Sequence, residues 1–147
     1  MAELDSHRAG VASHRDGVVV VGLDAQGATT LTATELAPVR PDEVVLAAPV
    51  LEATERLAHE PTRRAEAFAD AGLRLARTVL LHGAPGTGKS LLVRYLCSSG
   101  PTRTTVIAGG LDAHLLGQAM EVALRLAPSI LVIEDVDEAA RDRQIPD

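Results

Sequence analysis

The feature that most constrains the fold of this chain is the segment 83–90, which reads GAPGTGKS. It satisfies the pattern G-x-x-x-x-G-K-[S/T] of a phosphate-binding loop at every specified position. Its lysine, Lys89, is the only lysine among the 14 lysine and arginine residues of the chain. A compact ammonium group therefore stands at a place where a planar guanidinium would be too wide. The segment predicts a site for a phosphate group.

The residues on either side of this motif fit the setting that it requires. Residues 78–82 (TVLLH) form an apolar run that predicts a buried strand. Residues 91–97 (LLVRYLC) predict a buried helix, and Gly100 followed by Pro101 predicts its end. A strand, a glycine-rich loop and a helix in this order form the supersecondary structure of phosphate-binding loops.

The residue types of the loop suit a nucleotide with Mg²⁺. Gly86 and Gly88 lack a Cβ atom, so the backbone can turn several N–H groups inward around a phosphate, and the helix N-terminus adds a partial positive charge. Lys89 would reach the β- and γ-phosphates, and the Ser90 hydroxyl would ligate Mg²⁺. We expect the nucleotide to be bound by Gly83, Ala84, Pro85, Gly86, Thr87, Gly88, Lys89, Ser90 and Leu91.

A second informative segment is 129–137, which reads SILVIEDVD. Its apolar residues predict a short buried strand, and Glu134 and Asp135 follow at the carboxyl end, where ligands bind in open α/β sheets. The segment looks like a Walker B element, whose acids hold Mg²⁺ and orient the attacking water. The alternative is an acidic helix N-terminus favoured by the helix dipole. With a phosphate loop upstream, we expect Glu134 and Ser90 to bind Mg²⁺, and Glu134, Asp135 and Lys89 to be catalytic.

Composition excludes several classes of function. The formal net charge is -6, and Phe68 and Tyr95 are the only aromatic residues, so the chain offers neither a basic footprint nor stacking platforms for nucleic acid. Its one cysteine, Cys97, cannot form an internal disulfide and is expected in the core. No apolar run approaches the ~18 residues of a membrane span, and no signal peptide is visible, so we expect a cytoplasmic protein without membrane contact.

The first 41 residues differ in character from the rest. Residues 1–16 are polar and predict a solvated arm, not a metal site. Residues 17–22 and 28–34, separated by a turn at 24–27, predict a β-hairpin, which is marginally stable alone and must pack on something else. We therefore expect an N-terminal arm and hairpin region over residues 1–41 and a nucleotide-binding domain over residues 42–147.

The helical signals lie on both sides of the phosphate loop. Pro49 suits a first helical turn, and Pro61 predicts the start of a second helix that runs through Phe68 and stops at Gly72. Residues 44–46 are compatible with a short strand. Farther along, residues 104–108 predict a core strand, and a helix capped by Asp112 is expected to run past Met120 to Leu126.

With these motifs in order, residues 42–143 resemble the AAA family of ATPases. The resemblance rests on a strand and two helices over 44–71, a strand and loop over 78–90, and the pair Ala127-Pro128 before the acidic strand. A guanine-recognition motif N-K-x-D and a transporter signature L-S-G-G-Q are absent from the sequence. The resemblance implies an α/β P-loop NTPase fold, a three-layer αβα arrangement with a parallel sheet, incomplete here and preceded by a small β-hairpin region.

The resemblance also implies a function. The complete protein would bind ATP or ADP with Mg²⁺ and would couple ATP hydrolysis to the remodelling of a protein substrate. Its partners would be ATP, that protein substrate and further copies of the same chain in a hexamer.

Three departures from the family separate binding from catalysis. The family's Walker B ends in Asp-Glu, whereas this chain has Glu134-Asp135. The family's pore loop carries an aromatic residue, whereas Leu115-Leu116-Gly117 stands here, and a leucine pair at helical spacing favours a core role. The family's sensor strand, arginine finger and helical lid have no counterpart before Asp147.

These departures leave the enzyme activity of the chain open. Taken alone, the 147 residues are expected to bind nucleotide weakly and to hydrolyse it slowly or not at all. Without the sensor strand, residues 78–82 and 129–133 would collapse together in another register, or the region would be partly ordered. The alternative function is a non-catalytic nucleotide-binding or assembly module. A small-molecule kinase is a further alternative, which would need an acceptor pocket that the sequence does not reveal.

Overall fold

The computed structural model describes residues 17–109 and 113–134. They belong to two compact units, which are described separately: a sheet unit, Met1–Glu35 with Thr102–Asp147, and a loop unit, Leu36–Pro101. The predicted arm over residues 1–16, the cap Asp112 and the acid Asp135 lie outside the described residues. The domain boundary expected after residue 41 stays a prediction. Among the helices that the structure describes, none is long and apolar enough to cross a membrane.

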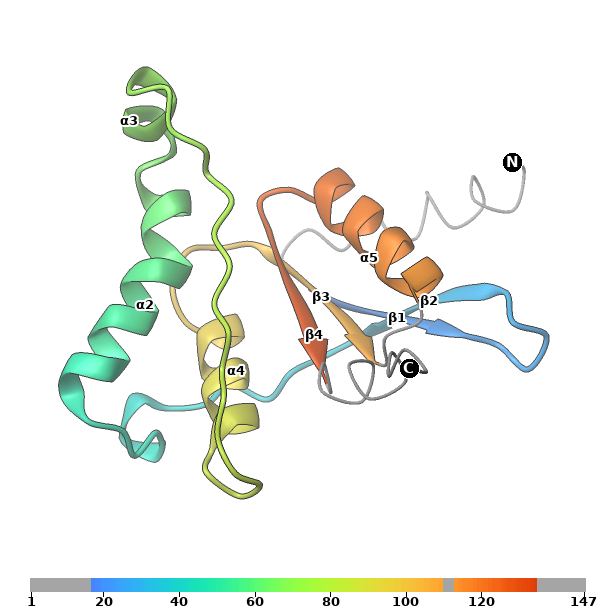
Figure 1. The fold of residues 1–147 in the computed structure, drawn as a ribbon, viewed down its shortest axis with the longest axis horizontal. Coiled ribbons are helices and arrows are strands. Elements are labelled where there is room, and N and C mark those ends of the chain that lie inside the picture. The colour runs from blue at the N-terminus through green and yellow to red at the C-terminus, as the bar shows by residue number, and fades with distance from the viewer. Residues whose placement is uncertain (1–16, 110–112, 135–147) are drawn as a thin grey trace, which may run out of the picture. The chain divides into compact units, whose positions relative to one another are not determined.

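The sheet unit contains four strands in the order β2-β1-β3-β4 (Figure 1). The antiparallel hairpin consists of β1 (Val18–Leu23) and β2 (Thr29–Thr34). The strands β3 (Thr104–Gly109) and β4 (Ser129–Glu134) are parallel to one another, and β1 is parallel to β3. The predicted hairpin and both predicted core strands are thus confirmed, and the hairpin is stabilised by pairing with β3.

The hairpin turn follows from two residues. The Asp24 carboxylate accepts hydrogen bonds from the backbone N–H groups of Gln26 and Ala28 at 2.9 and 2.8 Å. Gly27 adopts a φ of 80°, which a residue without a Cβ atom reaches at low cost. An aspartate that bonds its own backbone and a glycine in the left-handed region are typical of a tight turn.

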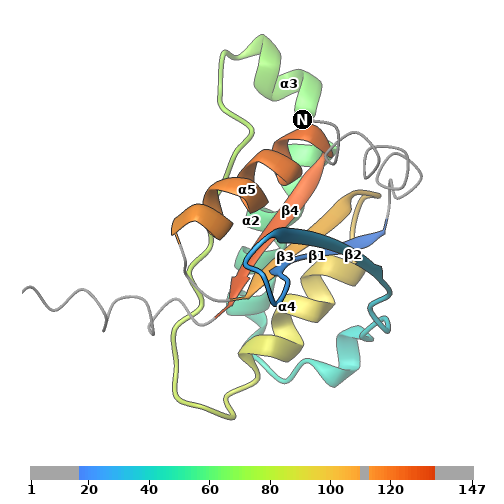
Figure 2. The same cartoon turned by 90° about the vertical axis from the view of Figure 1, so that its right-hand side faces the viewer.

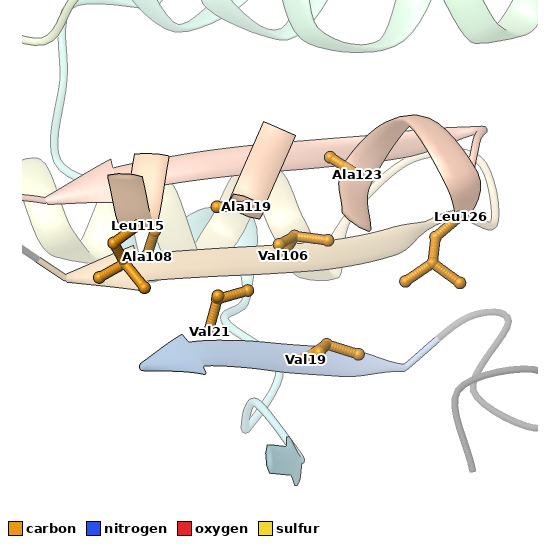
Figure 3. Packing of buried hydrophobic residues seen from close by; sticks show 8 residues of the cluster. All are labelled: Val19, Val21, Val106, Ala108, Leu115, Ala119, Ala123 and Leu126. Atoms are coloured by element: carbon orange, nitrogen blue, oxygen red, sulfur yellow. The ribbon is translucent and has the colours of Figure 1, made fainter. Parts of the chain in front are cut away.

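The core of the sheet unit lies between one face of the sheet and the helix α5 (Ala113–Arg125), as Figures 2 and 3 show. Residues at a spacing of four along α5 point to the sheet, which is the spacing of one helix face. Leu115 is therefore a core residue, as expected from its position in a leucine pair. The cluster consists of Val19, Val21, Val106, Ala108, Leu115, Ala119, Ala123 and Leu126.

The loop unit contains a short 3₁₀ turn (Pro41–Glu43) and the helices α2 (Ala48–Arg63), α3 (Ala65–Asp70) and α4 (Lys89–Ser98). Its core joins the start of the unit to α4 and consists of Val39, Val44, Leu92, Tyr95 and Leu96. The predicted helix after the phosphate loop is confirmed, with Leu92, Tyr95 and Leu96 buried and Cys97 half-buried.

One helix boundary was predicted wrongly. Pro61 does not begin a second helix; it lies within the last turn of α2, and α3 begins at Ala65. The residues before Pro61 continue the helix because the apolar positions of α2 pack on α4, and this packing outweighs the local preference of a proline for a first turn. The predicted stop holds, since Gly72 adopts a φ of 65° just after α3.

Two predicted strands are also wrong. Residues 44–46 form no strand, although Val44 is buried in the core of the loop unit. Residues 78–82 form no strand either, and the Leu80 side chain is 75% exposed. An apolar run becomes a strand only when another strand satisfies its backbone groups, and the strands of the described residues all belong to the sheet unit. The strand β4 pairs with β3, and residues 78–82 take part in no ladder of the described residues.

Candidate phosphate-binding site

The loop of the candidate site is a tight backbone turn before α4. The Thr87 hydroxyl donates a hydrogen bond of 2.8 Å to the carbonyl oxygen of Ala84, and the Thr87 N–H approaches the same oxygen at 3.4 Å. Gly86 and Gly88 have φ values of 79° and 88°. A side chain at either glycine would strain the backbone in this conformation. The expectation that these glycines let the chain curl is confirmed.

Gly83 has a different role from the other two glycines. A Cβ atom at Gly83 would lie 3.0 Å from the Thr87 hydroxyl oxygen, which is tighter than an ordinary contact. The first glycine of the motif is therefore needed because Thr87 closes the turn against it. The motif pattern itself leaves the position of Thr87 unspecified, so this partnership had no signal in the sequence.

The N-terminus of α4 provides unpaired N–H groups and positive potential. The first backbone bond of the helix runs from the Leu92 N–H to the Gly88 carbonyl at 2.9 Å, so the N–H groups of Lys89, Ser90 and Leu91 have no acceptor within the helix. No acidic side chain lies in the first turn of α4. The partial positive charge of the helix end is thus not neutralised locally, which favours an anion there.

The Lys89 ammonium group lies within the loop. Its Nζ donates hydrogen bonds to the carbonyl oxygens of Gly83 at 2.7 Å and Ala84 at 2.9 Å. An ammonium group has three N–H donors, so these two bonds fix its position and leave a further donor for a ligand. Lys89 is half-buried, and its charge adds to the potential of the helix N-terminus.

The last two residues of the predicted site differ in the exposure of their side chains. Ser90 is exposed in the first turn of α4, where its hydroxyl is accessible to a ligand. Leu91 is half-buried, and its side chain packs against the core of the loop unit. At Leu91 it is the backbone N–H that remains for an anion.

The predicted acids belong to the other unit. Glu134 is the last residue of β4 and is exposed at the carboxyl end of the strand. The expected metal pair, Ser90 and Glu134, therefore draws on both units, and neither unit contains it alone. Within the described ranges, no group of three or more histidine, cysteine or acidic side chains is arranged to hold a metal ion.

The sheet, the helices and the glycine-rich loop that leads into α4 are those of an incomplete α/β P-loop NTPase fold. This fold defines the class of protein to which the chain belongs. Residues 79–146 match the model of the family described as "ATPase family associated with various cellular activities (AAA)". Over these residues the chain is therefore similar to part of an AAA-family ATPase domain.

Individual relatives agree with this family. The chain is similar to an ATP-dependent zinc metalloprotease FtsH of Akkermansia muciniphila, with 36% identity over 89 residues, which cover 55% of this chain and 11% of the relative. A proteasome-activating nucleotidase of Methanosphaerula palustris is 32% identical over 91 residues, covering 56% of this chain and 22% of the relative. A proteasome-activating nucleotidase of Saccharolobus islandicus is 28% identical over 163 aligned positions, which cover 90% of this chain and 41% of the relative. The chain thus spans less than half the length of these relatives.

Proposed function

We propose that segment 83–91 binds the phosphates of ATP or ADP, and that the complete protein hydrolyses ATP to remodel protein substrates. The observation that carries the proposal is the position of Lys89. Its ammonium group is bonded to two carbonyl oxygens of a loop that has two left-handed glycines and leads directly into the free N–H groups of α4. A fixed cation beside several N–H donors is the arrangement that phosphate oxygens require.

The remaining residues have distinct roles in this proposal. Lys89 binds the β- and γ-phosphates, and the backbone N–H groups at the start of α4 bind phosphate oxygens. The Ser90 hydroxyl and the Glu134 carboxylate are oxygen ligands of the kind that Mg²⁺ prefers, and both are exposed. Bound Mg²⁺ would neutralise charge on the phosphates. Asp135 follows Glu134 in the chain and would orient the attacking water.

The relatives support the proposal that the substrate is a protein. One is named as an ATP-dependent protease and the others as nucleotidases that activate the proteasome. Both names connect a nucleotide to the processing of proteins. We propose the same connection here, in a homo-oligomer that we expect to be a hexamer.

A second function is a nucleotide-binding module without catalysis. It is favoured by the state of residues 78–82, which lead into the loop without the support of a sheet. A loop supported only by its helix can bind an anion, whereas hydrolysis also requires acids held at a defined distance. Binding without turnover would identify this function.

Replacement of Lys89 tests the binding site that both functions share. We expect Lys89→Ala to weaken the affinity for ATP at least tenfold, about 1.4 kcal/mol, because the fixed cation is lost. Calorimetric titration in Mg²⁺ measures this affinity. Arg94→Ala is the matched control, since it removes one positive charge from an exposed position of the same helix. Equal affinities of the wild type and Lys89→Ala would place the nucleotide elsewhere.

A further inference from the structure

Two side-chain hydrogen bonds join α2 to the end of α4 that lies farther from the phosphate loop. The Tyr95 hydroxyl donates to the Glu55 carboxylate. The His59 Nε2 lies 3.2 Å from the Ser99 hydroxyl oxygen. Tyr95 and His59 are only 5% and 2% exposed. Each bond joins one of these buried side chains to a half-buried partner, and the two bonds together restrict how α4 can move on α2.

A glycine completes this contact. Gly100 follows α4 with a φ of 87°, and a Cβ atom there would lie 2.6 Å from the His59 Nδ1 and 2.8 Å from two ring carbons. The imidazole of His59 therefore packs directly on the backbone of Gly100. Even alanine at this position would displace the ring or the turn. We call Glu55, His59, Tyr95, Ser99 and Gly100 the α2–α4 clamp.

The clamp adds directional contacts to the apolar packing of α4, which includes Leu81 just before the loop. Residues 78–82, which precede the loop, form no strand, so no ladder of backbone hydrogen bonds fixes that side of it. The loop is connected on its other side to α4, a helix of ten residues. The orientation of the loop thus follows the orientation of the helix.

The geometry of a helix sets the size of the effect. Lys89 is six residues from Tyr95, about 9 Å along the helix axis. A tilt of about 6° at the clamp would therefore move the start of α4 by about 1 Å. Displacements of about this size are enough to weaken a site in which several groups must contact one ligand.

We propose that Glu55, His59 and Tyr95 are positioning residues for the phosphate loop: by fixing the far end of α4 on α2, they set the direction in which Lys89 and the helix N–H groups meet the phosphates. This proposal rests on the proposed function of the loop. These residues contact no phosphate themselves and act through α4.

The first test is Gly100→Ala, with Gly72→Ala as its matched control. Both glycines have a positive φ, so both substitutions strain the backbone, but no atom lies within 4 Å of a Cβ atom at Gly72. We expect Gly100→Ala to weaken ATP affinity at least fivefold and Gly72→Ala to change it less than twofold. Circular dichroism of both variants reports whether the helices persist.

The second test removes one hydrogen bond without a clash. Tyr95→Phe keeps the buried ring and loses the hydroxyl, and we expect at least a threefold loss of ATP affinity. Glu55→Gln is the conservative variant, since its amide oxygen still accepts the Tyr95 hydrogen bond, and we expect its affinity to stay within twofold of the wild type. If Gly100→Ala does not fold, Tyr95→Phe alone tests whether the clamp positions the phosphate loop.

A readout without nucleotide separates this proposal from the proposed function. We expect Gly100→Ala and Tyr95→Phe to shift the amide resonances of Gly86 and Gly88 in the full 147-residue chain, and Gly72→Ala to leave them in place. Unchanged loop resonances in a folded Gly100→Ala or Tyr95→Phe variant would overturn the proposal. If the wild type shows no Lys89-dependent binding, the proposed function fails, and the loop resonances still decide whether the clamp positions the loop.

Discussion

The Tyr95 side chain combines two environments. Its ring packs in the core of the loop unit, and its hydroxyl donates to Glu55 from another helix. The pKa of Tyr95 is raised above its ordinary value, first by this hydrogen bond, then by burial and by the negative charge of Glu55; a hydrogen bond with Ser99 acts in the opposite direction. The hydrogen bond to Glu55 requires the protonated phenol, so it is lost when Tyr95 ionises.

The raised pKa leads to a prediction about pH. In the unfolded chain Tyr95 titrates near about 10, so its contribution to stability is fully present below that pH and is lost as the pH rises through the higher folded pKa. Tyr95 is the only tyrosine and the chain has no tryptophan, so phenolate absorbance reports this one group. We expect a midpoint above about 10 in the folded protein and a lower midpoint in Glu55→Ala. A midpoint that Glu55→Ala leaves unchanged would contradict the assigned cause.

Sequence patterns were sufficient for the residues whose role is local. The positive φ values of Gly86 and Gly88 agree with the curl expected of this glycine-rich loop, because such a curl is a property of consecutive residues. The bond between Tyr95 and Glu55 joins residues 40 positions apart. Neither residue carries a pattern that points to the other, so this part of the loop's support could be found only in the structure.

At the scale of elements, periodicity predicted those whose partners lie in the same unit. The hairpin, β3, α5 and β4 form as expected because they bury one another's apolar faces. Residues 78–82 have an equally apolar sequence and form no strand. The strands β3 and β4 have neighbouring strands that bond their backbone groups, whereas residues 78–82 have none among the described residues. The sequence of a segment does not specify whether such a neighbour is present. Pro61 shows the same limit for a helix boundary.

Hydrogen exchange tests this contrast between elements. The strand β3 is paired on both sides, by β1 and β4, so its amides should be the slowest in the sheet unit. Residues 78–82 belong to no strand and should exchange about 100-fold faster or more. Mass spectrometry of peptides from the two segments measures both rates in one sample. Similar rates would show that residues 78–82 have structural support in solution.

At the scale of the whole molecule, binding and hydrolysis make different demands. Binding of phosphate draws on residues 83–91, which all belong to the loop unit. Hydrolysis in our proposal also needs Glu134 and Asp135, which belong to the sheet unit. Relatives matched over 11 to 41% of their length have many residues beyond those aligned here. Affinity for nucleotide and turnover can therefore be separated by experiment.

This separation leads to the last prediction. We expect the 147-residue chain to hydrolyse ATP no faster than its Lys89→Ala variant, even where calorimetry shows Lys89-dependent binding. In related phosphoryl-transfer enzymes, an arginine that stabilises the transition state contributes about 10³-fold or more to the rate, and our proposal assigns no arginine of this chain to that role. Release of inorganic phosphate at saturating ATP and Mg²⁺ measures the rate, with Arg94→Ala as the control for loss of charge. Steady turnover in the wild type that disappears in Lys89→Ala but persists in Arg94→Ala would show that these residues alone assemble a catalytic site, because the loop and the acids would then have to meet around one nucleotide.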